Sequence, residues 1–135
     1  MITIKRALRG AVGPLVAGAL LASGAGLAVA GTSYSNFSTT VGKLNGNGYT
    51  GTQTKSGTGT NGNITTSQVG GSYQVDARLQ KSNGSSSGSW KKNLDDGDSA
   101  SLPNSISSGS STRVNLNNDL TTPVDVQVTG KWRSN

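Results

Sequence analysis

The chain of 135 residues contains no cysteine, no histidine and no glutamate. Without cysteine there is no disulfide framework, so a folded domain must be stabilised by its core, its sheet ladders or assembly. The absence of histidine removes the commonest general base and the commonest zinc ligand, and the absence of glutamate removes half of the carboxylate repertoire. These absences leave the chain few groups for catalysis or metal binding.

Large apolar side chains are also scarce, because the chain has only two Trp, three Tyr and one Phe, and 31% hydrophobic residues. Burial of such side chains is the main favourable term in folding. A single sheet with so few of them would be marginally stable. We therefore expect pairing between the edges of subunits to supply additional hydrogen bonds.

The composition of the chain changes at residue 30, from a largely apolar segment to a polar one. Three cations between positions 5 and 9 precede an apolar run at 11–29, and Ala28 and Ala30 place small side chains before Gly31. This pattern is typical of a secretory signal peptide. A retained membrane anchor is the alternative, because the run approaches the ~20 residues of a spanning helix. Its glycines and proline favour cleavage, which predicts a signal peptide at 1–30 and a single secreted, extracellular domain at 31–135.

The charge of that domain is modest. It keeps nine of the 12 Lys and Arg and all six acids, each of them Asp, which leaves a net charge of +3. Aromatic residues do not alternate with cations, as they do on nucleic-acid platforms. We therefore expect no nucleic-acid partner.

Apolar and polar residues alternate in several segments, which predicts half-buried strands. The clearest are 73–80, 113–117 and 124–129. Shorter, Thr-rich segments at 37–41, 49–55 and 64–69 are also strand candidates, because a branched Cβ suits the pleat. We expect them near the sheet edges, where Lys55 would discourage edge-to-edge pairing.

Turn signals separate these segments. Asn-Gly pairs begin at residues 45, 47, 61 and 83, and each can supply the positive φ of a hairpin turn. The stretch 95–98 is a further turn candidate. Seven or eight short strands at intervals of about 8–15 residues predict an all-β fold, a small antiparallel sandwich or barrel.

Asp95, Asp96 and Asp98 are the candidate metal ligands, because carboxylate oxygens suit Ca²⁺. Their spacing does not match the calcium-loop pattern, and Asp and Gly are common turn residues. A solvated turn is therefore the simpler interpretation, and no metal or cofactor is expected.

Trp90 and Trp132 could form a binding platform or pack in the core. In an alternating strand Trp132 lies on the same face as the valines before it. Trp90 lies on the same face as Leu94. Core packing is expected for both, because aromatic side chains dominate core energetics. Trp90, with the adjacent Lys91 and Lys92, remains the candidate binding surface.

No catalytic residue is predicted, since paired Asp side chains would have to come from distant segments. These observations favour a secreted, non-enzymatic interaction or structural protein, whose partner is itself or a cell-surface or matrix component. A bacteriocin-like or pore-forming antibacterial protein is the alternative, because the chain is small, cationic and rich in Ser, Thr and Gly; only this alternative involves membrane contact. In its signal peptide and polar β-rich composition the chain is similar to small secreted proteins of Gram-positive bacteria.

Overall fold

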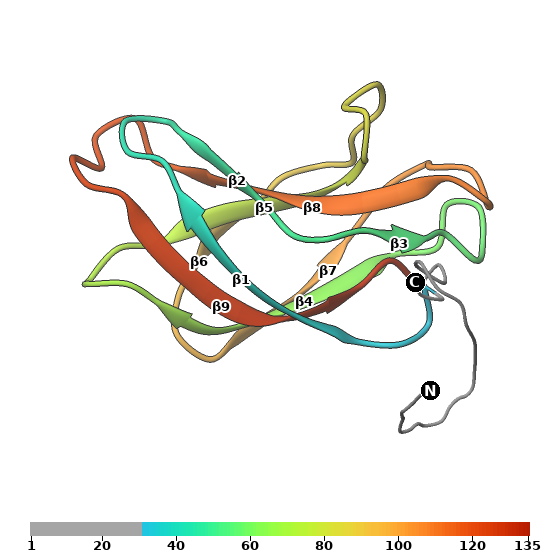
Figure 1. Ribbon diagram of the computed structural model, residues 1–135, viewed down its shortest axis with the longest axis horizontal. Helices are drawn as coiled ribbons and strands as arrows, with labels where there is room; N and C mark the ends of the chain where they lie inside the picture. The colour runs from blue at the N-terminus through green and yellow to red at the C-terminus, as the bar shows by residue number, and fades with distance from the viewer. Residues whose placement is uncertain (1–30) are drawn as a thin grey trace, which may run out of the picture.

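The computed structural model describes residues 31–135, and these form two antiparallel sheets packed face to face (Figure 1). One sheet has the order β1-β9-β4-β7; the other has the order β2-β8-β5-β6, with β3 also paired to β8. The nine strands are β1 Ser35–Val41, β2 Asn47–Tyr49, β3 Gln53–Thr54, β4 Gly62–Val69, β5 Val75–Lys81, β6 Lys91–Leu94, β7 Asp98–Leu102, β8 Ser111–Asn118 and β9 Val126–Arg133. The predicted all-β sandwich is confirmed.

The expected signal peptide and the cleavage residues Ala28 and Ala30 lie outside the described residues. Within 31–135 no helix is long and apolar enough to cross a membrane.

The core lies between the sheets and is built by strand alternation. Val75, Ala77 and Leu79 of β5 are fully buried, as are Val114 and Leu116 of β8. Successive side chains of a strand point to opposite faces, so the polar residues between them face outward. The alternation at 75–79 and 113–117 therefore predicted the inner faces of these two strands correctly.

Two predicted strands are too long at their starts. Val124 is 44% exposed and precedes β9. The preceding residue, Pro123, has no N–H to donate to a strand ladder. The following residue, Asp125, is bonded elsewhere, because its carboxylate accepts a hydrogen bond from the backbone N–H of Lys43. Tyr73 precedes β5 and follows a turn in which Gly71 has φ of 62°.

The Asn-Gly pairs do not all form turns. Asn47 and Gly48 lie in β2, and Gly62 begins β4. In the loop after β1 the positive φ values belong to Leu44 and Asn45, one residue earlier than the Asn-Gly pair predicted. Their backbone N–H groups donate to carbonyls in the 119–122 segment, so a tertiary contact sets this conformation.

The expectation that the Thr-rich segments lie at sheet edges is correct for β1 and β3 but wrong for β4, which lies between β9 and β7. Thr66 of β4 is fully buried, and its hydroxyl donates to the carbonyl of Asp95 at 2.6 Å. A buried hydroxyl is tolerated when it is hydrogen-bonded. Threonine content therefore did not distinguish an edge strand from a central one.

Lys55 does not protect an edge, because only 1% of its surface is exposed. Its Nζ donates to the carbonyls of Thr60 and Ser134. Gln53 lies beside it and is bonded to the same end of β9: its Nε2 donates to the carbonyl of Trp132, and its Oε1 accepts from the N–H of Ser134. These two buried polar side chains attach the short strand β3 to the end of the other sheet.

Candidate binding surface

The outward side chains of the second sheet form a polar face, which we call the amide–arginine face. They are positioned by the same alternation that buries the inner residues of β5 and β8. The face comprises Asn47, Tyr49, Asp76, Arg78, Gln80, Trp90, Lys92, Arg113, Asn115 and Asn117.

Arg113 of β8 is held by two neighbouring strands. It stands opposite Gln80 of β5, and its Nε donates to Gln80 Oε1 at 2.9 Å. On the other side its Cζ lies 3.8 Å from the centre of the Tyr49 ring. Tyr49 is still 41% exposed, so the stack lies at the surface. A guanidinium over an aromatic face is attracted by the ring quadrupole, which fixes its plane.

Arg78 of β5 is held in the same manner. It stands opposite Asn115, and its Nε donates to Asn115 Oδ1 at 3.0 Å. Its Cζ lies 4.3 Å from the centre of the Trp90 ring. Asn115 is 2% exposed and donates in turn to Asn47 Oδ1 at 3.1 Å, so the network crosses three strands.

Both guanidinium groups therefore have their Nε atoms occupied and one side covered by an aromatic ring. Among residues 31–135 no hydrogen bond is made by the terminal Nη atoms of Arg78 or Arg113. These paired N–H groups are the part of arginine that binds carboxylate or phosphate through two parallel hydrogen bonds. The face presents two such groups in fixed orientations.

The acidic residues of the domain do not form ion pairs with Arg78 or Arg113 within residues 31–135. Asp76 is the only carboxylate on the face, and it accepts from Lys92 Nζ at 3.2 Å and from the backbone N of Asn93. The register of β5, β6 and β8 places the β6–β7 and β8–β9 connections at one end of the sheet. The other five acids lie in or beside these connections: Asp95, Asp96, Asp98, Asp119 and Asp125.

The two tryptophans have different environments. Trp132 is 1% exposed and packs in the core, as expected. Trp90 is only half-buried and lies on Arg78, so the expected core position is wrong. The cause is an extra residue in β6, where Val75 pairs with Leu94 but Ala77 pairs with Lys91.

This bulge changes the phase of the strand. Asn93 has φ of 62°, a conformation that Asn adopts more readily than most residues, so Leu94 points into the core while Lys92 points outward. Of the candidate surface residues, Trp90 and Lys91 are half-buried and Lys92 is exposed.

The three clustered aspartates stabilise a turn and its neighbour. Asp98 Oδ2 accepts from the N–H of Asp95, and Asp95 Oδ1 accepts from the N–H of Asp96, both at 2.8 Å. Asp96 Oδ1 accepts from the N–H of Val69 in β4 at 2.7 Å. Residues 31–135 contain no group of three acidic, His or Cys side chains arranged to hold a metal ion. The predicted turn is present, and its carboxylates are engaged with the backbone.

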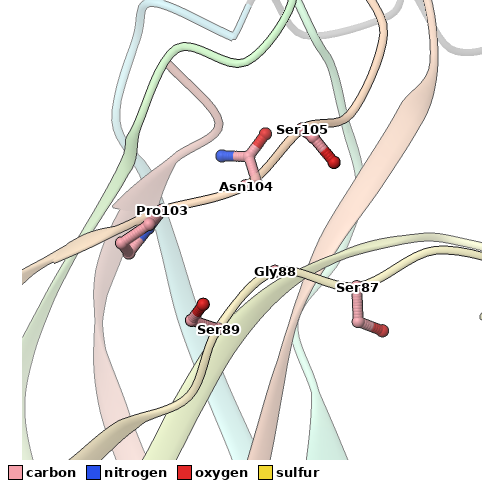
Figure 2. A pocket seen from close by; sticks show the side chains of 6 residues that line it. All are labelled: Ser87, Gly88, Ser89, Pro103, Asn104 and Ser105. Carbon is pink, nitrogen blue, oxygen red and sulfur yellow. The ribbon is translucent and has the colours of Figure 1, made fainter.

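A polar pocket adjoins the amide–arginine face. Figure 2 shows its two walls, Ser87, Gly88 and Ser89 before β6 and Pro103, Asn104 and Ser105 after β7. The walls approach closely, since a Cβ on Gly88 would lie 2.0 Å from the carbonyl oxygen of Pro103. Ser87 Oγ accepts from Gln80 Nε2 at 3.1 Å, which connects the pocket to the partner of Arg113. None of the residues lining the pocket is titratable.

Two spacings found around catalytic serines occur near this pocket, Gly84-x-Ser86-x-Gly88 and Ser89-x-x-Lys92. Neither has the required surroundings. Ser86 lies in the connection between β5 and β6, where its carbonyl accepts from the N–H of Lys81, and not on a strand-to-helix turn. Lys92 Nζ is paired with Asp76, and within 31–135 no hydrogen bond joins it to Ser89.

Sequence reasoning identified Trp90 and Lys92 but missed Tyr49, Arg78 and Arg113. The signal was available in part, because the polar positions of 76–80 and 113–117 alternate with the core residues. What the sequence does not contain is the register that sets these strands side by side. Comparison of the chain with protein-family models, with curated proteins and with solved structures finds no match.

Proposed function

We propose that the chain is a secreted, non-enzymatic interaction protein that binds a cell-surface or matrix component through the amide–arginine face. The observation that carries this proposal is the pair of guanidinium groups, each stacked on an aromatic ring and each with terminal N–H groups that make no hydrogen bond within residues 31–135. Side chains ordered by their own neighbours lose little conformational entropy when they bind a ligand.

A binding role rather than a catalytic one is supported by the chemistry of the polar residues. The chain has no histidine, and none of the residues that line the pocket is titratable. Asp76 is paired with Lys92, and the clustered aspartates are bonded to backbone N–H groups. Within the described part of the chain, residues 31–135, no general base is therefore placed beside a serine of the pocket. Secretion is supported by the signal-peptide pattern of residues 1–30.

An extracellular polymer suits this face better than a nucleic acid. Single-stranded nucleic acids bind by stacking their bases on free aromatic faces. Here the guanidinium groups of Arg113 and Arg78 cover one side of Tyr49 and of Trp90. The antibacterial pore alternative requires a segment such as 50–67 to leave the fold, and this segment includes most of β4, a central strand in which Ile64 and Thr66 are buried.

The test is retention of labelled protein on the cell-wall and matrix material of the cells that produce it. The double variant Tyr49→Ala/Trp90→Ala should reduce retention about tenfold or more, because both arginines lose the rings that orient them. Tyr34→Ala is the matched control, since Tyr34 is 45% exposed and also contacts cations, Lys131 and Arg133, but outside this face. Equal retention of the two variants would contradict the proposal.

Self-association through β1 is a second candidate function. β1 is a seven-residue edge strand with the sequence SNFSTTV, which contains no charge and no proline. Natural edge strands usually carry such residues to prevent pairing with another chain. Light scattering over a wide concentration range should show growth beyond the monomer, and Ser38→Lys/Thr40→Lys should abolish it. A constant monomeric mass for the unmodified protein would contradict this candidate.

A further inference from the structure

We infer that the ligand of the amide–arginine face is an acidic polysaccharide, a polymer with carboxylates on repeated sugar units. This inference rests on the proposed function and specifies its ligand. It depends on three properties of the face: the diagonal placement of its two arginines, the neutral polar groups beside them, and its continuity with the pocket.

The two guanidinium groups are placed for two anions and not for one. Arg78 is directly opposite Asn115 in the ladder, and Arg113 precedes Asn115 by two residues on the same face of β8. Arg78 and Arg113 are therefore diagonal neighbours, whose Cα atoms lie roughly 7–8 Å apart in such a sheet. Each is bound to its own amide and its own ring, which holds the two guanidinium groups at separate positions. This arrangement suits successive charges along a polymer.

The groups around the two arginines are mostly neutral and polar. Exposed Asn47 and half-buried Asn117 present amide groups at the surface, and the buried amide of Asn115 orients Asn47 by donating to its Oδ1, as Asn117 also does. Tyr49 adds an exposed hydroxyl-bearing ring at the edge. Amides and hydroxyls both donate and accept hydrogen bonds, as sugar hydroxyls do. A purely basic surface would suit any polyanion, whereas this mixture suits one in which hydroxyls surround each carboxylate.

The path of such a polymer continues beyond the arginines. Gln80 binds Arg113 through Oε1 and Ser87 through Nε2, so the face passes directly into the pocket of Figure 2. That pocket is lined by three serines, an asparagine and no charged side chain, which suits a neutral part of a sugar chain. The five aspartates at the far end of the sheet would repel the acidic polymer and so favour the path from Arg78 towards the pocket.

The experiment measures the affinity of the secreted protein for polygalacturonate, with neutral dextran and inorganic polyphosphate as comparison polymers. Arg78→Gln/Arg113→Gln should weaken polygalacturonate binding about tenfold or more, because both charged two-bond contacts are lost. Arg78→Lys/Arg113→Lys keeps the charge but not the planar fork and should weaken it about threefold or more. Lys131→Gln/Arg133→Gln removes the same charge from the other sheet and should change affinity less than twofold. Thermal melts establish that each variant is folded.

Several outcomes would overturn the inference. Tighter binding to polyphosphate, equal binding to dextran, or equal effects of the Arg78/Arg113 and Lys131/Arg133 glutamine pairs would each exclude the carboxylate assignment. If the protein is retained on extracellular material in a manner that depends on Tyr49 and Trp90 but does not bind polygalacturonate, the inference fails while the proposed function stands. If the protein is neither retained on extracellular material nor bound to polygalacturonate, both the inference and the proposed function fail.

Discussion

The ammonium group of Lys55 lies 2.6 Å from the carbonyl oxygen of Ser134, in the interior of the sandwich. A lysine beside the short strand β3 is thus bonded to the residue that follows β9. Burial disfavours the charged form, so the pKa of Lys55 is lowered from its ordinary value of 10.5. Within residues 31–135 the only ion pair joins Lys92 and Asp76, so Lys55 is held by carbonyl groups alone.

Lys55 should make stability depend on pH on the alkaline side. The folded state releases this proton more readily than the unfolded chain, so the unfolded state binds more protons between the lowered pKa and 10.5. The free energy of unfolding then rises with pH in this range. Compared with Lys55→Met, the unmodified protein should gain stability as the pH rises through the lowered pKa towards 10.5, as measured by urea unfolding at fixed salt. A difference between the two proteins that is constant or decreases with pH would contradict this.

The two tryptophans should differ in their effect on stability. Trp132→Ala removes a large core side chain that is 1% exposed and should lower the free energy of unfolding by about 3–5 kcal/mol. Trp90→Ala removes a surface ring stacked on Arg78 and should cost about 1 kcal/mol or less. Chemical denaturation of both variants measures the difference. Similar losses would mean that Trp90 also belongs to the core.

We predict that the chain is secreted and that, after cleavage, it begins at Gly31. Ala28 and Ala30 present small side chains to the signal peptidase. Gly31 is itself packed against the end of the chain, since its carbonyl accepts from the N–H of Asn135 and a Cβ on it would lie 2.2 Å from Ser134 Oγ. Mass spectrometry of protein from the medium checks the start. An intact Met1 in the membrane fraction would restore the anchor interpretation.

Period-two patterns predicted the inner faces of β5 and β8 because alternation is a local property of a strand. Lys55, Trp90 and Val124 were misplaced because their positions depend on contacts with neighbouring segments of the fold. The carbonyls of Thr60 and Ser134 allow Lys55 to be buried, and the bulge in β6, where it pairs with β5, leaves Trp90 on the outer face while Leu94 points into the core. Such contacts leave no periodic signal.

The sequence predicted only part of the candidate site. Trp90 and Lys92 were identified because large aromatics and adjacent cations are conspicuous in a polar sequence. The stacking of Arg113 on Tyr49 joins β8 to β2, strands separated by more than 60 residues. Only the register of the sheet brings these residues together, and hydrophobic patterning leaves register open where both faces of a strand contain polar residues.

The most direct test of the binding face is an NMR titration of the ¹⁵N-labelled protein with oligogalacturonate. The largest amide shifts should cluster at Tyr49, Arg78 and Arg113, and the Nε–H signals of the two arginines should also move. On the outer side of the other sheet, Thr65 and Gln127 should remain unchanged. Shifts centred on Thr65 and Gln127, or confined to the loops at the acidic end, would contradict it.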